Sequence, residues 1–255
     1  MLFFVSVSWG NDSVALVQWL HEKYALGEHR VICVYADTGW AASDWPARVE
    51  RGEALARSYG FEVARLHGGN FVELAMKKKS WPRNGMQFCT EELKVKPLTA
   101  FHRAHDPDKE GICVAGIRRA ESRARAQWPE DVPESPKHDG RDAWFPLVRV
   151  TDEERDALLH RAGFEVLAQR SRECFPCIHA NRADLRLLPE ARIAEIEQLE
   201  AAMGHTEEGK PRTLFRPYHH QGATGIRETI AWAWSERGQY DPSYVPGCDS
   251  GVCGD

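Results

Sequence analysis

The stretch that decides the fold is Val7-Ser8-Trp9-Gly10-Asn11-Asp12-Ser13-Val14-Ala15-Leu16. An apolar run over residues 2–7 predicts a buried strand that ends here, and the pattern over residues 13–24 predicts a helix that begins here. The backbone N–H groups at such a helix start converge, and the helix dipole favours negative charge at that point. Gly10 permits a close approach of the backbone, and the hydroxyls of Ser8 and Ser13 are further donors. We therefore interpret the stretch as a phosphate-binding loop.

An ordinary strand-to-helix turn with Asp12 as the N-cap is the alternative interpretation of this stretch. A Walker-type loop is excluded, because no Gly-Lys-Ser/Thr follows the strand.

Strand and helix patterns alternate through the first half of the chain. The runs predicted as strands are 2–7, 31–36, 61–66 and 112–115, and those predicted as helices are 13–24 and 45–59. Continuous apolar strands separated by helices are typical of a parallel sheet that is covered on both faces. The sequence therefore predicts a doubly wound α/β core, with ligands at the carboxyl ends of its strands.

The second half has a different pattern. Residues 127–144 hold three prolines and many charges, which favours a loop or mobile lid. Thr151-x-x-Glu154 is a capping box that opens a helix, and further helices are predicted over 189–203 and 226–236. We expect a nucleotide-binding core over residues 1–125, then a helical, cysteine-bearing cap over residues 126–255 that ends in an irregular tail.

Composition describes an ordinary globular protein. The 255 residues include 33 Lys+Arg and 38 Asp+Glu, a formal net charge of −5, and 42% are hydrophobic. The mild acidity argues against a broad nucleic-acid-binding surface but permits a local basic groove. No apolar run approaches the roughly 20 residues that span a bilayer. The N-terminal residues lack the basic region of a signal peptide, so we expect a cytoplasmic protein with no membrane partner.

Seven cysteines in a chain without a secretion signal indicate a reducing compartment. Cys33 and Cys113 lie in apolar strand patterns and are expected to be core residues. Cys174 and Cys177 form a Cys-x-x-Cys turn, while Cys248 and Cys253 form a second close pair near the end of the sequence. Four thiolates suit a [4Fe–4S] cluster or a structural zinc ion, and spacing alone does not choose between them.

Several segments together resemble a known family. Ser8-x-Gly10-x-Asp12-Ser13 is similar to the Ser-Gly-Gly-x-Asp-Ser loop of the PP-loop ATP pyrophosphatases, although Trp9 replaces the usual second glycine. Three segments resemble the phosphoadenosine phosphosulfate (PAPS) reductase branch of that superfamily, namely Tyr35-Ala36-Asp37-Thr38-Gly39, the Cys89–Leu98 segment Cys-Thr-Glu-Glu-Leu-Lys-Val-Lys-Pro-Leu, and the Gly116–Arg125 segment Gly-Ile-Arg-Arg-Ala-Glu-Ser-x-x-Arg. The resemblance covers roughly the first half of the chain, in the family's order.

This resemblance implies an adenine nucleotide alpha hydrolase-like fold and a set of site residues. The residues expected to bind ATP are Ser8, Gly10, Asn11, Asp12, Ser13, Asp37, Thr38, Gly116 and Arg118. Asp12 and Asp37 are the expected Mg²⁺ or ribose contacts, and Lys94 and Arg118 would neutralise developing charge. Together with Cys89, the residues Asp12, Lys94 and Arg118 are the expected catalytic set.

The resemblance also favours iron–sulfur over zinc, because several members of this branch carry a [4Fe–4S] cluster. Their ligands include a Cys-x-x-Cys pair and a cysteine that matches Cys89. Five cysteines then compete for four places, so one of Cys89, Cys248 and Cys253 is expected to be a free, reactive thiol.

The leading functional hypothesis is an enzyme that adenylates an acceptor with release of pyrophosphate and then transfers sulfur to it. The cluster would carry the sulfur or bind it at an open iron. The acceptor could be a nucleic acid or a small metabolite, and a protein could donate the sulfur. The alternatives are a sulfonucleotide reductase that releases sulfite and a non-enzymatic nucleotide- or redox-sensing module. The characteristic reductase tail Glu-Cys-Gly-Leu-His is absent from this chain.

Overall fold

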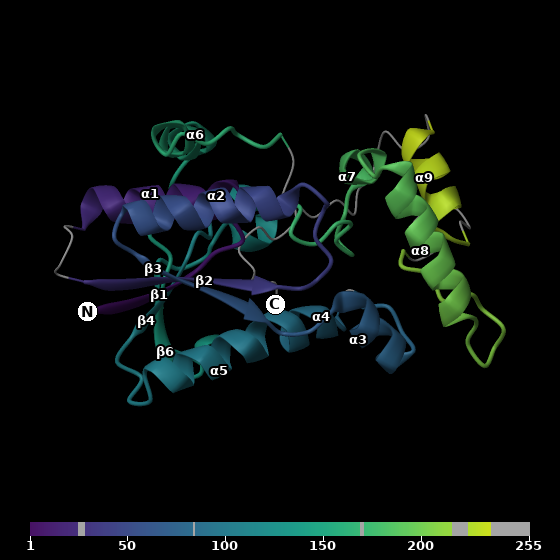
Figure 1. Cartoon of the computed structure of the whole chain (residues 1–255), viewed down its shortest axis with the longest axis horizontal. Coiled ribbons are helices and arrows are strands. Elements are labelled where there is room, and N and C mark those ends of the chain that lie inside the picture. The colour runs from purple at the N-terminus through teal and green to yellow at the C-terminus, as the bar shows by residue number, and fades with distance from the viewer. Residues whose placement is uncertain (25–28, 84, 169–170, 216–223, 236–255) are drawn as a thin grey trace.

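A computed structural model describes the chain except for residues 25–28, 84, 169–170, 216–223 and 236–255 (Figure 1). In the described part, a six-stranded sheet has the order β3-β2-β1-β4-β6-β5. Its strands are β1 (Leu2–Ser6), β2 (Arg30–Asp37), β3 (Glu62–His67), β4 (Ile112–Ala115), β5 (Asp131–Ser135) and β6 (Arg141–Trp144). All neighbouring pairs are parallel except β5 and β6, which are antiparallel. The predicted α/β class is confirmed.

Helices cover both faces of the sheet, as a doubly wound fold requires. The helices are α1 (Asn11–Lys23), α2 (Trp45–Ser58), α3 (Phe71–Lys78), α4 (Phe88–Thr90), α5 (Lys96–His105), α6 (Asp152–Arg161), α7 (Arg182–Arg186), α8 (Glu190–Met203) and α9 (Ile226–Trp234). Figure 1 shows α1 and α2 on one face with α6 outside them, and α3, α4 and α5 on the other. A π-helical turn (Glu91–Val95) joins α4 to α5. Helices α7, α8 and α9 gather at one end of the molecule, and all three belong to the part of the chain, residues 126–255, that the sequence predicted as a helical cap.

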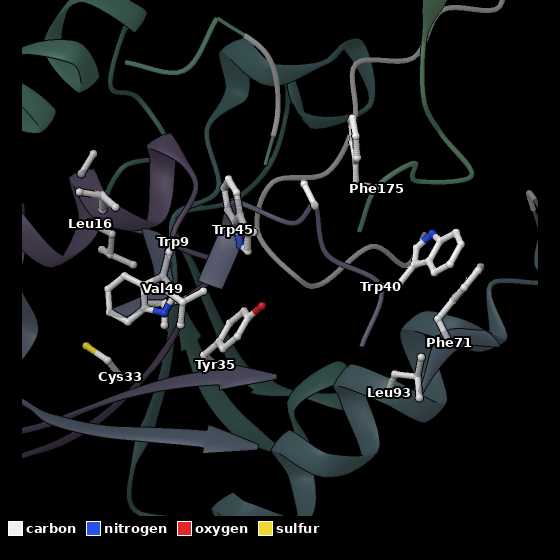
Figure 2. Close-up of a cluster of buried hydrophobic side chains, with 14 of the residues drawn as sticks. Trp9, Leu16, Cys33, Tyr35, Trp40, Trp45, Val49, Phe71, Leu93 and Phe175 are labelled. Carbon is white, nitrogen blue, oxygen red and sulfur yellow. The ribbon is translucent and has the colours of Figure 1, made fainter. Parts of the chain in front are cut away.

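The two central strands, β1 and β4, are buried because they carry apolar side chains on both faces of the sheet. Phe3 and Val5 of β1 point into the layer beneath α1 and α2, while Phe4 belongs to a smaller cluster with Leu98 of α5. Figure 2 shows part of the larger cluster, in which Trp9 lies with Leu16 of α1 and Val49 of α2. The sheet is thereby held between two helical layers, and the turns at its carboxyl edge lie where the helices begin.

The predicted loop or lid over residues 127–144 is wrong. Within it, β5 and β6 form an antiparallel pair, and β6 pairs with β4 through Cys113 opposite Ala143 and Val114 opposite Trp144. Short edge strands can contain proline and charge, because one side of an edge strand has no ladder to complete. The sheet therefore crosses residue 125. The division at that residue stays a prediction about folding units.

The predicted helices of the second half are confirmed. Thr151 and Glu154 form a reciprocal capping box at α6, with Glu154 N donating to Thr151 Oγ1 (3.2 Å) and Thr151 N to Glu154 Oε2 (2.8 Å). Helices α8 and α9 occupy the two other predicted segments. The tail over residues 239–255 lies outside the described residues. Across the described part of the chain, no helix is both long and apolar enough to cross a membrane.

Candidate active site

The loop from Ser8 to Ser13 connects β1 to α1 at the carboxyl edge of the sheet, as predicted. Its hydroxyls are used within the loop: Gly10 N donates to Ser8 Oγ (3.3 Å), and Ser13 Oγ donates to the Gly10 carbonyl (3.2 Å). Gly10 is the N-cap of α1, and no side chain caps that end. The first N–H groups of an uncapped helix have no intrahelical acceptor, so this turn is suited to receive an anion.

Asp12 lies in the first turn of α1 and is 1% exposed. Its Oδ1 accepts a hydrogen bond from Arg118 Nε, while its Oδ2 is buried without a hydrogen-bond partner among the described residues. Arg118 also pairs through NH2 with Asp152 Oδ1 (2.9 Å) at the start of α6. The structure thus brings together Asp12 and Arg118, which the sequence had placed in the site separately. Arg118 holds two carboxylates here, and a direct contact with a phosphate stays a prediction.

Gly116 explains how β4 can lie so close to the loop. A Cβ at this position would lie 2.7 Å from the Asp12 carbonyl oxygen and 3.0 Å from its carbonyl carbon. These are backbone atoms of the first helical turn, so they cannot move aside as a flexible side chain could. A glycine is therefore required for β4 and α1 to place Arg118 beside Asp12.

Asn11 has a role in the loop's packing. Its Nδ2 donates to the Leu167 carbonyl (2.9 Å), and Leu167 N donates to Asn11 Oδ1 (3.0 Å). The nitrogen and the oxygen of the Asn11 side chain are therefore both hydrogen-bonded to the backbone of the segment that follows α6. Asn11 thus fastens the second half of the protein to the phosphate loop, while its predicted contact with ATP stays a prediction.

The Cys-x-x-Cys turn packs against the end of β2. Thr38 Oγ1 donates to the Glu173 carbonyl (3.3 Å) and lies 3.5 Å from Cys174 Sγ. Phe175 N donates to the Trp40 carbonyl (2.8 Å), and a Cβ on Gly10 would lie 3.0 Å from Ser171 Cβ. The segment from Ser171 to Cys177 therefore runs over the same sheet edge as the phosphate loop. Asp37 lies at this edge too, where its Oδ1 accepts from Gly39 N (2.9 Å).

Lys94 lies in the π-helical turn and donates through Nζ to Glu173 Oε1. The side chains are 11% and 7% exposed, so the pair is buried. Burial alone would disfavour the charged form of Lys94, but the Glu173 carboxylate and the nearby sulfur atoms outweigh it, and the pKa of Lys94 is raised. Lys94 is therefore a fixed positive charge beside the cysteines.

Three of the five candidate cysteines come together around Lys94. Burial raises the pKa of Cys174 to about 11, and Lys94 opposes that shift while Cys177 adds to it. Burial also raises the pKa of Cys89, to which Cys174 contributes. Within the described ranges, however, no three His, Cys, Asp or Glu side chains are arranged to hold a metal ion. Cys248 and Cys253 lie outside the described residues.

Sequence reasoning missed two carboxylates of the site. Glu173 holds Lys94, and Glu121 accepts from Arg118 N through Oε1 (2.6 Å) and pairs with Arg125 through Oε2. The signal for Glu121 was its position in the Gly116–Arg125 motif. The only signal for Glu173 was its place directly before Cys174, which does not reveal a partner 79 residues away.

Comparison with known proteins decides the family. Residues 3–168 match the phosphoadenosine phosphosulfate reductase domain. The chain belongs to this family. The matched residues include the sheet except for Leu2 at the start of β1, and they include the phosphate loop, Lys94 and Arg118. In this PAPS reductase-like protein, the Cys-x-x-Cys turn and helices α7 to α9 lie beyond the matched region.

Two relatives are similar in sequence to this PAPS reductase-like chain. The "uncharacterized 37.8 kDa protein in gpa 5′ region" of Escherichia phage 186 is 30% identical over 241 residues, which cover 78% of this chain and 69% of the phage protein. An uncharacterized protein of Methanocaldococcus jannaschii is 34% identical over 122 residues, which cover 48% of this chain and 24% of that protein.

Three solved structures share parts of the fold. The U34-tRNA thiolase NcsA from Methanococcus maripaludis, with its [4Fe-4S] cluster, has a TM-score of 0.48 at 16% identity and covers 66% of this chain and 59% of its own. PAPS reductase from Candida auris has a TM-score of 0.43 at 14% identity, with coverage of 64% and 74%. NH3-dependent NAD synthetase from Campylobacter jejuni has a TM-score of 0.42 at 16% identity, with coverage of 79% and 82%. Identities and scores this low support no conclusion about function.

Proposed function

We propose that this protein binds ATP at the carboxyl edge of its sheet, transfers the adenylyl group to an acceptor oxygen with release of pyrophosphate, and then directs sulfur to the activated carbon. The observation that carries the nucleotide part is the buried Asp12, which lies at the uncapped start of α1 and leaves Oδ2 without a partner among the described residues. A carboxylate beside a phosphate site repels the phosphate unless a cation lies between them. Mg²⁺ prefers carboxylate and phosphate oxygens, so Asp12 is suited to hold Mg²⁺ on the nucleotide.

The proposed adenylation step uses the loop as an anion site. The acceptor oxygen attacks the α-phosphorus, the bond to the bridging oxygen breaks, and pyrophosphate leaves with the electron pair of that bond. The N–H groups of the Ser8–Ser13 loop would stabilise the leaving charge, and Arg118 would keep the Asp12 carboxylate in place.

The sulfur part of the proposal rests on where the thiols lie. Cys174 lies 3.5 Å from Thr38 Oγ1 at the end of β2, and Ser171 packs on Gly10 of the phosphate loop. A sulfur nucleophile held here would be next to the adenylated acceptor. Attack on the activated carbon forms a C–S bond, breaks the C–O bond and releases AMP with its electron pair. Acceptors of the expected classes, a nucleic acid or a small metabolite, and a sulfur-donor protein remain proposals.

A [4Fe–4S] cluster is not supported by the described residues alone, because they contain no set of three ligands arranged for a metal. Cys174, Cys177 and Cys89 supply soft sulfur donors near one another, and the buried thiols have raised pKa values that a bound metal would lower.

The test is product analysis with purified protein and Mg²⁺. ATP labelled in the γ-phosphate is incubated with an RNA pool or a small-metabolite pool, and labelled pyrophosphate is separated from phosphate. We expect acceptor-dependent pyrophosphate from the wild-type protein and about 10²-fold less, or lower still, from Asp12→Asn. Equal release by both proteins would contradict the assignment of the loop.

The second candidate is a sulfonucleotide reductase, which the family match favours. In this reaction a thiolate attacks the sulfur of an adenylyl sulfate, the S–O bond breaks and the nucleotide leaves. A second thiol then releases sulfite and forms a disulfide, which an external dithiol reduces. Sulfite from adenylyl sulfate would select this candidate over the first. Nucleotide binding with neither product would favour the sensing module.

A further inference from the structure

Trp9 has an unusual backbone conformation for its size. Its φ angle is +62°, in the left-handed region that glycine enters freely and that bulky residues avoid. The side chain is fully buried, and its Nε1 has no hydrogen-bond partner among the described residues. The indole is therefore held by its fit into the core, and the same residue is part of the phosphate loop.

The space for the indole is provided by Gly52 in the middle of α2. A Cβ at position 52 would lie 2.2 Å from Cε3 and 2.5 Å from Cδ2 of the Trp9 ring. Glycine inside a helix is unfavourable compared with alanine, so its presence here indicates a packing requirement. The absence of a side chain at Gly52 leaves the space on α2 that the Trp9 ring occupies.

Helix α2 also holds the backbone of Trp9. Arg48, one turn before Gly52, donates through Nε to the Trp9 carbonyl (2.7 Å). A backbone carbonyl that points toward a phosphate would repel it. The Trp9 carbonyl instead accepts a hydrogen bond from the Arg48 guanidinium of α2. The contact with Arg48 therefore favours a loop in which N–H groups face the anion.

We propose that α2, through Gly52 and Arg48, holds Trp9 in its left-handed conformation and so keeps the phosphate loop in its nucleotide-binding form before the nucleotide arrives. The statement about the nucleotide rests on the proposed function. Trp9, Gly52 and Arg48 are then positioning residues that act through the loop. A loop that is already ordered binds its ligand without an additional loss of conformational entropy.

The test compares Gly52→Ala, Trp9→Gly and the double variant with the wild-type protein. Glu50→Ala is the matched control, because Glu50 is exposed on the same helix. Hydrogen exchange of the loop amides 8–13 is measured without nucleotide, and the Kd for Mg-ATP is measured by calorimetry. Thermal midpoints show whether each variant is folded.

Gly52→Ala should speed the exchange of the loop amides and raise the Kd for Mg-ATP about tenfold or more, since a displacement of 1 Å in a site has effects of this size. In the double variant the alanine has room. Its Kd should therefore return to within about threefold of that of Trp9→Gly, a non-additivity expected for residues in contact. Glu50→Ala should leave both measurements unchanged.

Two outcomes would overturn the inference. One is a folded Gly52→Ala variant whose loop exchange equals that of the wild-type protein. The other is a double variant in which the effects of the single changes simply add. If the wild-type protein itself does not bind Mg-ATP, the proposed function fails, while loop exchange in the five proteins still decides the role of Trp9 and Gly52.

Discussion

The guanidinium of Arg118 donates from Nε to the carboxylate of Asp12, although the two residues are 106 positions apart in the chain. This pair joins the end of β4 to the first turn of α1, and both side chains are almost fully buried. Asp152 binds the other side of Arg118 (2.9 Å) from the start of α6. Arg118 thus connects the first turn of α1 to β4 and to α6, in addition to the contacts that Asn11 makes with Leu167.

Asp12→Asn should lower Mg-ATP turnover by about 10²-fold or more, since the carboxylate that would hold the cation is lost. Initial rates of pyrophosphate release at several Mg²⁺ concentrations measure the effect. Asp152→Asn is the control, because Asp152 pairs with the outer side of Arg118 and with Arg155, and we expect a much smaller loss. Equal losses in the two variants would show that Asp12 acts only through the ion-pair network.

Arg118→Lys should also weaken nucleotide binding, because one ammonium group cannot reproduce the fork that reaches Asp12 and Asp152 together. Calorimetric titration with Mg-ATP checks this prediction. Arg123→Lys, at an exposed position of the same segment, serves as the comparison. An unchanged affinity in Arg118→Lys would mean that the bidentate geometry is dispensable.

Glu173→Gln should destabilise the protein by about 3–5 kcal/mol, because it leaves Lys94 buried and charged without its carboxylate. Urea denaturation gives the free energy of unfolding. The exposed pair of Lys96 and Glu92 (2.8 Å) provides the contrast, and Lys96→Met should leave the free energy of unfolding nearly unchanged because water screens the pair. Similar losses in the free energy of unfolding for Glu173→Gln and Lys96→Met would argue that water reaches the Lys94–Glu173 pair.

Acidification should destabilise the protein through His102. Burial, with Arg141 nearby, lowers the pKa of His102 to about 4, below its ordinary value of 6.5. A lowered folded-state pKa gives stability that is present above pH 6.5 and is lost as the pH falls toward 4, by up to about 3 kcal/mol. The groups facing His102 include His138, and burial lowers the pKa of His138 to about 4 as well. Part of the stability lost on acidification therefore comes from His138.

The free energy of unfolding of the wild-type protein and of His102→Asn, measured between pH 7 and pH 4, isolates this contribution. We expect the variant to lose less stability over that range. Parallel curves for the two proteins would show that His102 is accessible to protons in the folded state.

Anaerobically prepared protein should be brown and contain about four iron and four sulfide per chain, if thiolates of this chain hold a cluster. Cys174→Ser and Cys177→Ser should each lose most of the iron. Among Cys89→Ser, Cys248→Ser and Cys253→Ser, at least one should keep iron while losing activity, since five thiols compete for four places. Iron, zinc and sulfide analysis of each variant measures the outcome.

Two results would contradict the cluster. Colourless protein with one tightly bound zinc ion would indicate a structural zinc site. Iron retained in all five variants would mean that other residues are the ligands.

The sequence by itself determined the α/β class, the first four strands and the strand–turn–helix at residues 8–13 that we interpret as a phosphate loop. These features are local: alternation of apolar runs and helical patterns depends on neighbouring residues, and a strand followed by a polar turn and a helix dictates where N–H groups converge. The capping box at Thr151 was predictable for the same reason, because its two hydrogen bonds join residues three positions apart.

Only the tertiary structure decided which distant side chains meet. Judged from its neighbours in sequence alone, Gly52 only destabilises its helix. Its fit to Trp9 requires α2 to lie against the phosphate loop. Glu173 gains its importance from Lys94. Pro133 is compatible with a strand because β5 lies at the edge of the sheet, and Pro129 and Pro136 lie outside the strands. Such contacts depend on how whole elements pack, and packing is set by all the buried surfaces together, which no local spacing records.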